Sequence, residues 1–259
     1  MALPVVYIEI RGHETQAEVF LNDIPIDLFG ADGQPVHTSR VSEYLVAGPN
    51  RVEVVVGHGT TPSRTRETQS LPPEGQGFLR MAAYYSPKEL LGVGGEELAR
   101  LEWGAAPGRI VSTVSLNLPY HGWAWERADV VTLDGATRRE LNELVIATHR
   151  AFEERNAAFL LEQSRIRLTE LSRCYDPLSA DAWLASFSRG VFNRSESAEW
   201  RVVPLDLQRA DFRLCAGGRL VDCVNSEWKG MVRTELSGVT FTDYRMLVGR
   251  IENVWHVLR

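Results

Sequence analysis

Hydrophobic and polar positions alternate through the first half of the chain, in short runs separated by turn residues. A period of two is typical of β-strands with one buried face. Five runs show it: VVYIEI (5–10), AEVFL (17–21), RVEVVVG (51–57), RIVSTVSLNL (109–118) and ADVVTL (128–133). Several short strands with turn signals between them predict an antiparallel β-sandwich over residues 1–134.

Two other patterns interrupt this alternation. Residues 57–77 have no periodicity and contain three prolines, so we predict a long loop there. The segments SPKELL (86–91) and GGEELARLEW (94–103) favour a helical turn each. Asn22 and Asp23 follow the strand-like run 17–21 and are a pair that typically reverses the chain. We expect Val19 and Leu21 before this turn, and Ile24 and Ile26 after it, to face the core.

The pattern changes near residue 135. Thr137 followed three positions later by Glu140 indicates a capping box, and no Gly or Pro occurs before Pro177. We therefore predict a helical segment over 137–175. Its apolar stripe moves to the opposite side after Phe159, so we expect a bend, a break, or two ends that meet different partners.

Alternation returns in the last third of the chain. Ser179 caps a predicted helix over 180–192, and strand-like runs follow from Glu199 to the end. Gly217-Gly218 reads as a hairpin turn, and Asn253 as a bend. Helices followed by an antiparallel meander predict an α+β domain over 135–259, so the fold class of the whole chain is α+β.

Two families resemble parts of this sequence. The segments AEVFLND (17–23) and EYLVAGPNRVEVVV (43–56) are similar to the turn-and-hairpin pattern of the galactose-binding-like jelly-roll module, over residues 16–56. That module occurs beside many glycosidases and often only supports a catalytic domain; no sugar-binding residue carries over. The order of elements in the second half resembles the cone-shaped, cystatin-like α+β fold of the nuclear transport factor two-like family, which implies a pocket inside a curved sheet.

Charge and cysteine content narrow the classes of partner. The net charge is −6, which disfavours nucleic acid because phosphate binding requires a basic surface. Residues 1–134 carry 10 basic and 17 acidic groups, and the remainder carries 18 and 17. Of the 28 basic residues 26 are Arg, a bias that points to GC-rich codons and a bacterial source. No apolar run is long enough to span a bilayer.

The three cysteines, Cys174, Cys215 and Cys223, form no CxxC pair, which favours a reduced, cytoplasmic chain. A Cys215–Cys223 bridge across a hairpin stays open, because a spacing of eight puts both residues on one face of a strand pair. A removed leader would place the protein in the periplasm instead.

The densest aromatic cluster is PYHGWAWE, residues 119–126. Trp123 and Trp125 share one face if this segment is a strand, and Tyr120 and His121 precede them. The cluster is a candidate stacking platform for a sugar or another flat ligand; the other interpretation is that it fills a core or an interface. Burial of both indoles decides between the two.

Catalytic patterns are weak throughout. The six histidines form neither HxH nor HExxH, so we expect no metal, and we expect no cofactor. There is no GxSxG motif. The carboxylates of the last sheet are candidate general bases if one points into a pocket: Asp206, Asp211, Asp222, Glu227 and Asp243.

Three functions follow from these observations. The first is a bacterial accessory protein without enzymatic activity that recognises another protein through the loop 57–77 or the aromatic cluster, with a homodimer as a further possibility. The second is a small-ligand carrier or enzyme with a cone-shaped pocket in residues 179–259, which a filled core at Phe212, Leu214, Met231, Phe241 and Met246 would remove. The third is carbohydrate binding through the sandwich.

Overall fold

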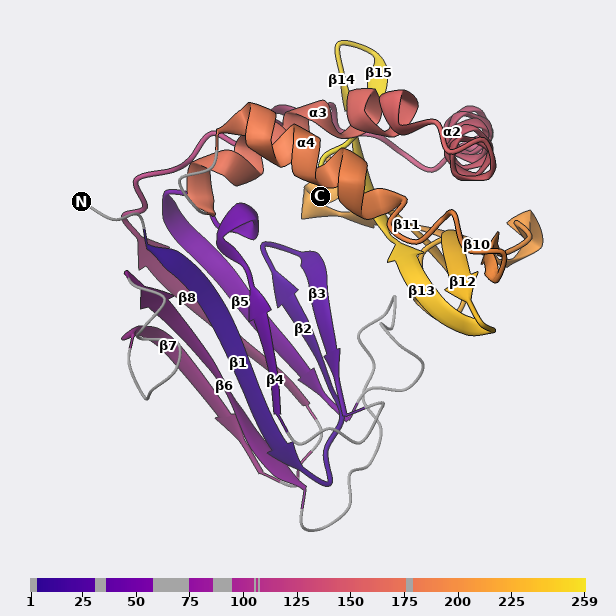
Figure 1. Cartoon of the computed structure of the whole chain (residues 1–259). Helices are drawn as coiled ribbons and strands as arrows, with labels where there is room; N and C mark the ends of the chain where they lie inside the picture. The colour runs from indigo at the N-terminus through magenta and orange to yellow at the C-terminus, as the bar shows by residue number, and fades with distance from the viewer. Residues whose placement is uncertain are drawn as a thin grey trace. The chain divides into compact units, whose positions relative to one another are not determined.

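The computed structural model describes residues 4–30, 36–57, 75–85, 95–104, 106, 108–175 and 179–259 (Figure 1). Its contacts divide the chain into two compact units, Met1–Gly122 and Trp123–Arg259. The boundary that the sequence pattern predicts, at residue 134, lies one short helix farther along the chain. Most of the loop predicted over 57–77, and the segment 86–91, lie outside the described residues.

The first unit consists of two four-stranded antiparallel sheets. One has the order β4-β1-β6-β7 and the other β3-β2-β5-β8. The elements are β1 (Val5–His13), β2 (Ala17–Leu21), β3 (Ile24–Phe29), β4 (Val36–Arg40), η1 (Ser42–Tyr44), β5 (Gly48–Val56), β6 (Gln76–Tyr84), β7 (Glu96–Trp103) and β8 (Gly108–Leu116).

The core of this unit lies between the two sheets. Alternate residues of β1, Val6, Ile8 and Ile10, are fully buried, and so are Val52 and Val54 of β5 in the opposite sheet. The sheets approach closely where a Cβ atom on Gly12 of β1 would lie 2.7 Å from the ring of Phe29 of β3. The predicted antiparallel sandwich is therefore present, built on the period-two burial that its sequence shows.

The Asn22-Asp23 turn is confirmed, with positive φ at both residues (50° and 68°). This is the geometry of the two-residue hairpin turn that Asn and Asp tolerate. Ile24 returns to the core as predicted, but Ile26 is only half-buried. A register shift between Val19 and Phe20 inserts one extra residue into β3, which takes Ile26 out of the alternation.

A pair of asparagine side chains fixes this hairpin to the loop that precedes β5. Asn22 Nδ2 donates to Asn50 Oδ1 (2.9 Å) and to the Tyr44 carbonyl (2.8 Å). Asn50, which is fully buried, also accepts from the Val46 amide (2.7 Å) and donates to the Val46 and Gly48 carbonyls. Asn22 and Asn50 thus have a structural role.

Replacing Asn50 with alanine is expected to lower the free energy of unfolding by about 2 kcal/mol, because it removes the buried amide that bonds to the partly buried backbone groups of Val46. Urea unfolding followed by circular dichroism measures the change. Asn117→Ala, at an exposed position just after β8, is the control for a general asparagine effect. A loss at Asn50 no larger than the loss at Asn117 would show that the asparagine pair does not hold the loop.

The second unit contains the helices α1 (Ala124–Arg127), α2 (Gly135–Glu153), α3 (Ala157–Cys174) and α4 (Ala180–Val191). Two antiparallel sheets follow, with orders β13-β12-β9 and β10-β11-β14-β15. Their elements are β9 (Trp200–Val202), η3 (Leu207–Arg209), β10 (Ala210–Cys215), η4 (Ala216–Gly218), β11 (Leu220–Asn225), β12 (Val232–Leu236), β13 (Val239–Tyr244), β14 (Met246–Ile251) and β15 (Val254–Val257). The predicted α+β fold class is confirmed.

The predicted helical segment 137–175 is broken into α2 and α3. Arg155 adopts a positive φ (52°) between them, and the Asn156 side chain caps α3 by accepting from the Phe159 amide (3.1 Å). The stripe therefore changes side because there are two helices. The predicted capping box was wrong: α2 starts two residues earlier, where Asp134 accepts from the Thr137 amide (2.8 Å).

Helices and sheets share one core in this unit. Leu141, Val145 and Phe152 of α2 pack with Leu160 of α3 and with Val232 of β12. α3 and α4 lie side by side (Figure 1), and Ser179 caps α4 as predicted, accepting from the Ala182 amide (3.2 Å). Among the described helices, none is long and apolar enough to cross a bilayer.

Two predicted turns of the last sheet are confirmed. Two other predictions, for residues 128–133 and for residues 94–103 of the first unit, are wrong. Gly217 and Gly218 take positive φ in the β10–β11 connection, and Asn253 does so in the β14–β15 turn. Residues 128–133 form no strand; the Val131 amide instead bonds to the Gly218 carbonyl (2.9 Å). The helical turn predicted within 94–103 is wrong, because β7 occupies it and pairs with β6.

Candidate functional site

The residues of the predicted stacking platform do not form a strand. Tyr120 is buried and donates to the Pro4 carbonyl (3.0 Å), and His121 is exposed. Trp123 is the N-cap of α1 and Trp125 lies inside that helix. Trp123 is 0% exposed and Trp125 is 5% exposed. Neither indole offers a ring face to a ligand in this conformation, which favours the core interpretation of the cluster.

Trp123 lies among charged side chains, of which Glu170 and Arg259 are buried and Arg173 is exposed. The guanidinium carbons of Arg173 and Arg259 lie 5.2 and 5.0 Å from its ring centroid. Glu170 Oε2 accepts from Arg259 Nη1 (2.7 Å), and its Oε1 accepts from the Ala124 amide (2.6 Å). This group joins α1, α3 and the end of the chain.

The interior of the second unit is largely filled. Phe212, Met231 and Met246, three of the residues that would line a cone-shaped pocket, pack in the core. Leu214 and Phe241 point to solvent instead, at 43% and 38% exposure. The buried Tyr244 hydroxyl bonds to Ser164 Oγ (3.0 Å), and burial raises the pKa of Tyr244. A phenol with a raised pKa is a weaker acid, so this pair suits structure better than proton transfer.

The carboxylates that sequence offers as general bases are engaged in structural contacts. Asp222 is fully buried and accepts two bonds from Arg245 and one from Trp228 Nε1 (3.0 Å). Hydrogen bonds from Arg209 and Lys229 lower the pKa of Glu227, opposite to the shift that a base working near neutral pH needs. Asp206 caps η3, Asp211 pairs with Arg213, and Asp243 accepts from the Gly230 amide.

We next consider the cysteines and the side chains that could bind a metal ion. All three cysteines are buried, and none of them forms a disulfide with another. Cys223 is paired with Phe212 and faces the core, whereas Cys215 lies three residues from Phe212 and therefore on the other face of β10. The bridge proposed from their spacing is thus not formed. Within the described ranges, no three His, Cys, Asp or Glu side chains gather as a metal site would require.

A different set of side chains forms an ordered surface on the outer side of the sheet β4-β1-β6-β7. The core-facing residues of β1 alternate with Tyr7, Glu9 and Arg11, which point outward. Their Cα partners on the neighbouring strands have the same orientation. We call this surface the arginine–aromatic face; it comprises Tyr7, Glu9, Arg11, Arg40, Phe78, Arg80, Tyr84, Glu97, Arg100 and Glu102.

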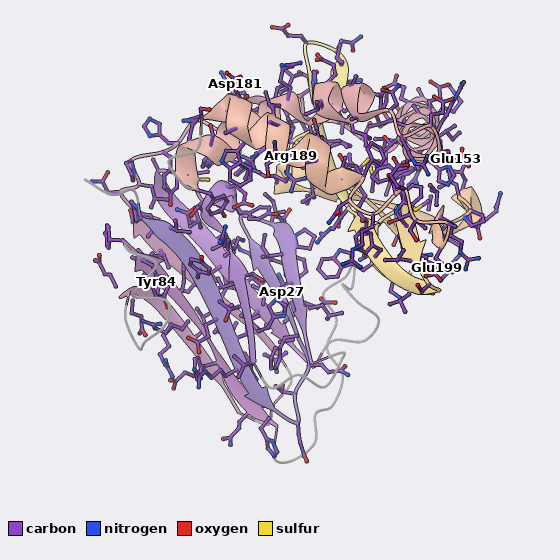
Figure 2. The ribbon with its side chains drawn as sticks, in the orientation of Figure 1. Asp27, Tyr84, Glu153, Asp181, Arg189 and Glu199 are labelled. Carbon is purple, nitrogen blue, oxygen red and sulfur yellow. The ribbon has the colours of Figure 1, made fainter. Side chains whose placement is uncertain are left out.

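Arg80 is at the centre of this face. Its Nη1 donates to the Tyr84 hydroxyl (3.0 Å) and its Nε to Glu97 Oε2 (3.1 Å), so it joins β6 to β7. Burial alone would lower the pKa of Arg80, but these hydrogen bonds outweigh it and hold the pKa above the ordinary value. Figure 2 labels Tyr84 on this sheet.

Aromatic rings and guanidinium groups alternate across the face. The rings of Tyr7 and Tyr84 meet edge to face with centroids 5.4 Å apart. Arg40 Nε donates to the Tyr7 hydroxyl (3.1 Å), and the guanidinium carbon of Arg100 lies 4.0 Å from the Phe78 ring centroid. Side chains from all four strands therefore contact one another on this face.

The charge of the face differs from that of its unit. Residues 1–122 contain 9 Lys and Arg against 14 Asp and Glu, a net charge of −5. The arginine–aromatic face carries four Arg and three Glu. Nearly half of the cations of an acidic unit are thus gathered on one side of one sheet, next to aromatic rings.

Sequence reasoning missed this face because three of its four strands were not recognised. β4 is short and polar, β6 begins inside the predicted loop 57–77, and β7 lies where a helical turn was predicted. The alternation of Phe78, Arg80, Ala82 and Tyr84 against Leu79, Met81 and Ala83 was a usable signal. Comparisons with protein-family models, with curated proteins and with solved structures find no match for this chain.

Proposed function

We propose that this protein is a binding protein without an enzymatic step, and that it recognises a partner protein through the arginine–aromatic face. The observation that carries the proposal is the network of Arg, Tyr and Phe side chains at the surface of four adjacent strands. Tyr and Arg dominate the residues that contribute most to protein interfaces, and charged residues other than Arg are depleted there.

The order within the network supports binding with little reorganisation. Holding a long side chain in one rotamer costs about 0.5–1.5 kcal/mol when a complex forms. Arg80, Arg40 and Arg100 already have hydrogen-bond or ring partners in the free protein. A partner that docks on these side chains therefore requires less loss of rotamer freedom when the complex forms.

The covering of the ring faces favours a protein over a carbohydrate. A sugar stacks on an open aromatic face, whereas Arg100 lies over Phe78 and Arg40 lies 5.9 Å from the Tyr7 centroid. The exposed guanidinium groups of Arg11 and Arg100, with side chains 57% and 38% exposed, instead suit carboxylates on a partner. The net charge of −5 on the unit opposes a polyphosphate ligand.

The proposal predicts that a photo-crosslinking amino acid at Thr38, in the host organism, forms a defined adduct with one protein. Thr38 is exposed on β4 and is the Cα partner of Glu9, so it lies within the face. The same amino acid at Thr240, exposed on β13 of the other unit, is the positional control. Adduct bands are measured by gel electrophoresis and identified by mass spectrometry.

Reversing the charge of arginines on the face tests whether the crosslink at Thr38 reports specific binding. The Arg40→Glu and Arg100→Glu pair is expected to reduce the Thr38 adduct at least tenfold, since hot-spot residues each contribute about 2 kcal/mol or more. Arg150→Glu, at a residue 73% exposed on α2, should leave it unchanged. Equal adducts at Thr38 and Thr240, or an adduct insensitive to the reversal, would contradict the proposal.

A further inference from the structure

Strand β8 is a long and regular edge. It ends the sheet order β3-β2-β5-β8, and among the described strands β5 is its sole neighbour in that sheet. Nine consecutive residues pair with β5 without a register shift, from Gly48↔Leu116 to Val56↔Gly108. An edge of this kind presents a row of backbone donors and acceptors to any strand that approaches it.

The usual protections of an edge strand are missing from β8. It contains no Pro, no Lys and no bulge, and Arg109, its one charged residue, is bound to the buried Glu53 (2.8 Å). The edge strand of the opposite sheet differs: β7 carries Glu96, Glu97, Arg100 and Glu102 and has an irregular register. Natural proteins use charges and bulges to prevent edge pairing, and β7 has both.

The core is incompletely covered along β8. Val54 and Val52 of β5 are fully buried, whereas their Cα partners Ile110 and Ser112 are half-exposed. Val111, on the outer side, is 49% exposed. A further strand beside β8 would bury apolar surface on both sides of the sheet, at about 25 cal/mol per Å².

The sequence of β8 fits an antiparallel copy of itself. If Ser112 lies opposite Ser112 of a second copy, then Ile110 faces Val114 and Val111 faces Thr113, and each of these pairs joins two β-branched residues on the same face. Arg109 then lies opposite Ser115, so no like charges meet. An isologous contact requires this kind of self-complementarity.

We propose that the chain forms a two-fold symmetric dimer through antiparallel pairing of β8 with β8 of a second copy, centred on Ser112. The pairing creates one eight-stranded sheet, β3-β2-β5-β8 followed by the same four strands in reverse order. Strand β13 is a weaker candidate for the same role. It is shorter, and its pairing with β12 has a register shift that bends the edge.

Sedimentation velocity of the full chain tests the dimer, at protein concentrations from about 1 to 300 µM, a range that spans the affinities of small interfaces. We expect a concentration-dependent rise from 29.1 kDa to twice that mass. The variant with Val111→Lys and Thr113→Lys should stay at 29.1 kDa, because each lysine faces a lysine of the other copy. Both side chains point away from the core, so the fold should persist, as circular dichroism checks.

A charge swap tests the register itself. The variant with Val111→Glu and Thr113→Glu should also be monomeric when alone. Mixed with the lysine variant, it should restore the dimer, because position 111 of one copy lies opposite position 113 of the other. Val239→Lys with Phe241→Lys on β13 is the matched control, and it should dimerise as the unmodified chain does.

Three results would overturn the proposal. The first is a monomer at every concentration, and the second is a dimer that the β8 lysines do not affect. The third is a pair of opposite-charge variants that remain monomeric when mixed. Loss of the dimer in the β13 control alone would assign the contact to β13 instead. None of these outcomes depends on the arginine–aromatic face, whose crosslinks with another protein are read separately.

Discussion

Replacing Trp123 with alanine is expected to lower the free energy of unfolding by about 3–5 kcal/mol, the range for a large aromatic side chain in a core. Trp123 is fully buried and leads the fully buried side chains of the described residues in volume. Its removal leaves a cavity beside the guanidinium groups of Arg173 and Arg259, and the surrounding helices can close it only in part. Urea unfolding followed by far-ultraviolet circular dichroism measures the loss.

A second tryptophan in the same unit provides the control. Trp255 is half-buried on β15 and donates from Nε1 to Glu140 (2.8 Å), so Trp255→Ala should cost less than half as much as Trp123→Ala. The stacking-platform interpretation predicts a different result. It requires Trp123→Ala to leave stability within about 0.5 kcal/mol of the unmodified chain, the usual range for a surface substitution, and to weaken binding of a flat ligand.

Glu170→Ala is expected to destabilise the second unit by a similar amount, about 3–5 kcal/mol, because it removes one partner of a buried ion pair. Glu170 and Arg259 are 5% and 2% exposed. Without the carboxylate, the Arg259 guanidinium loses its 2.7 Å contact while it stays buried, and the Ala124 amide loses its acceptor. Thermal and urea unfolding both report this loss.

The matched control is an exposed pair on the same helix. Glu162 and Arg165 of α3 are 67% and 56% exposed and lie 3.1 Å apart, so Glu162→Ala should change stability by no more than about 0.5 kcal/mol. Replacing Glu170 and Arg259 together by leucine should recover most of the loss, because apolar residues need no countercharge. If Glu170→Ala costs no more than Glu162→Ala, the pair does not hold α1, α3 and the chain end together.

The sequence predicts most of the fold because local chemistry decides it. The Asn22-Asp23 turn, the Ser179 cap and the strands β1, β2, β5 and β8 follow from periodicity and turn residues. The errors have the same origin. A Thr-x-x-Glu pattern at Thr137 and an acid-rich segment at residues 94–103 both satisfy a local helix rule, but Asp134 provides a better cap and strand pairing with β6 overrides helix propensity.

The candidate site could not be predicted in the same way. The aromatic cluster at Trp123 and Trp125 was visible in the sequence, but its burial depends on Arg259 and Glu170, which are far from it along the chain. The arginine–aromatic face depends on register: Arg40, Tyr7 and Tyr84 come from three strands that only pairing brings together. Neither register nor long-range burial can be read from spacing alone.

Hydroxyl-radical footprinting of the chain, with and without the protein captured at Thr38, tests the central claim most directly. Tyr and Phe rings at a surface react with the radical, and a docked partner protects them. We predict that Tyr7 and Phe78 of the arginine–aromatic face lose most of their reactivity on binding, whereas Phe241, 38% exposed on β13, keeps its own. Unchanged reactivity at Tyr7 and Phe78, with protection at Phe241 or elsewhere, would contradict the account.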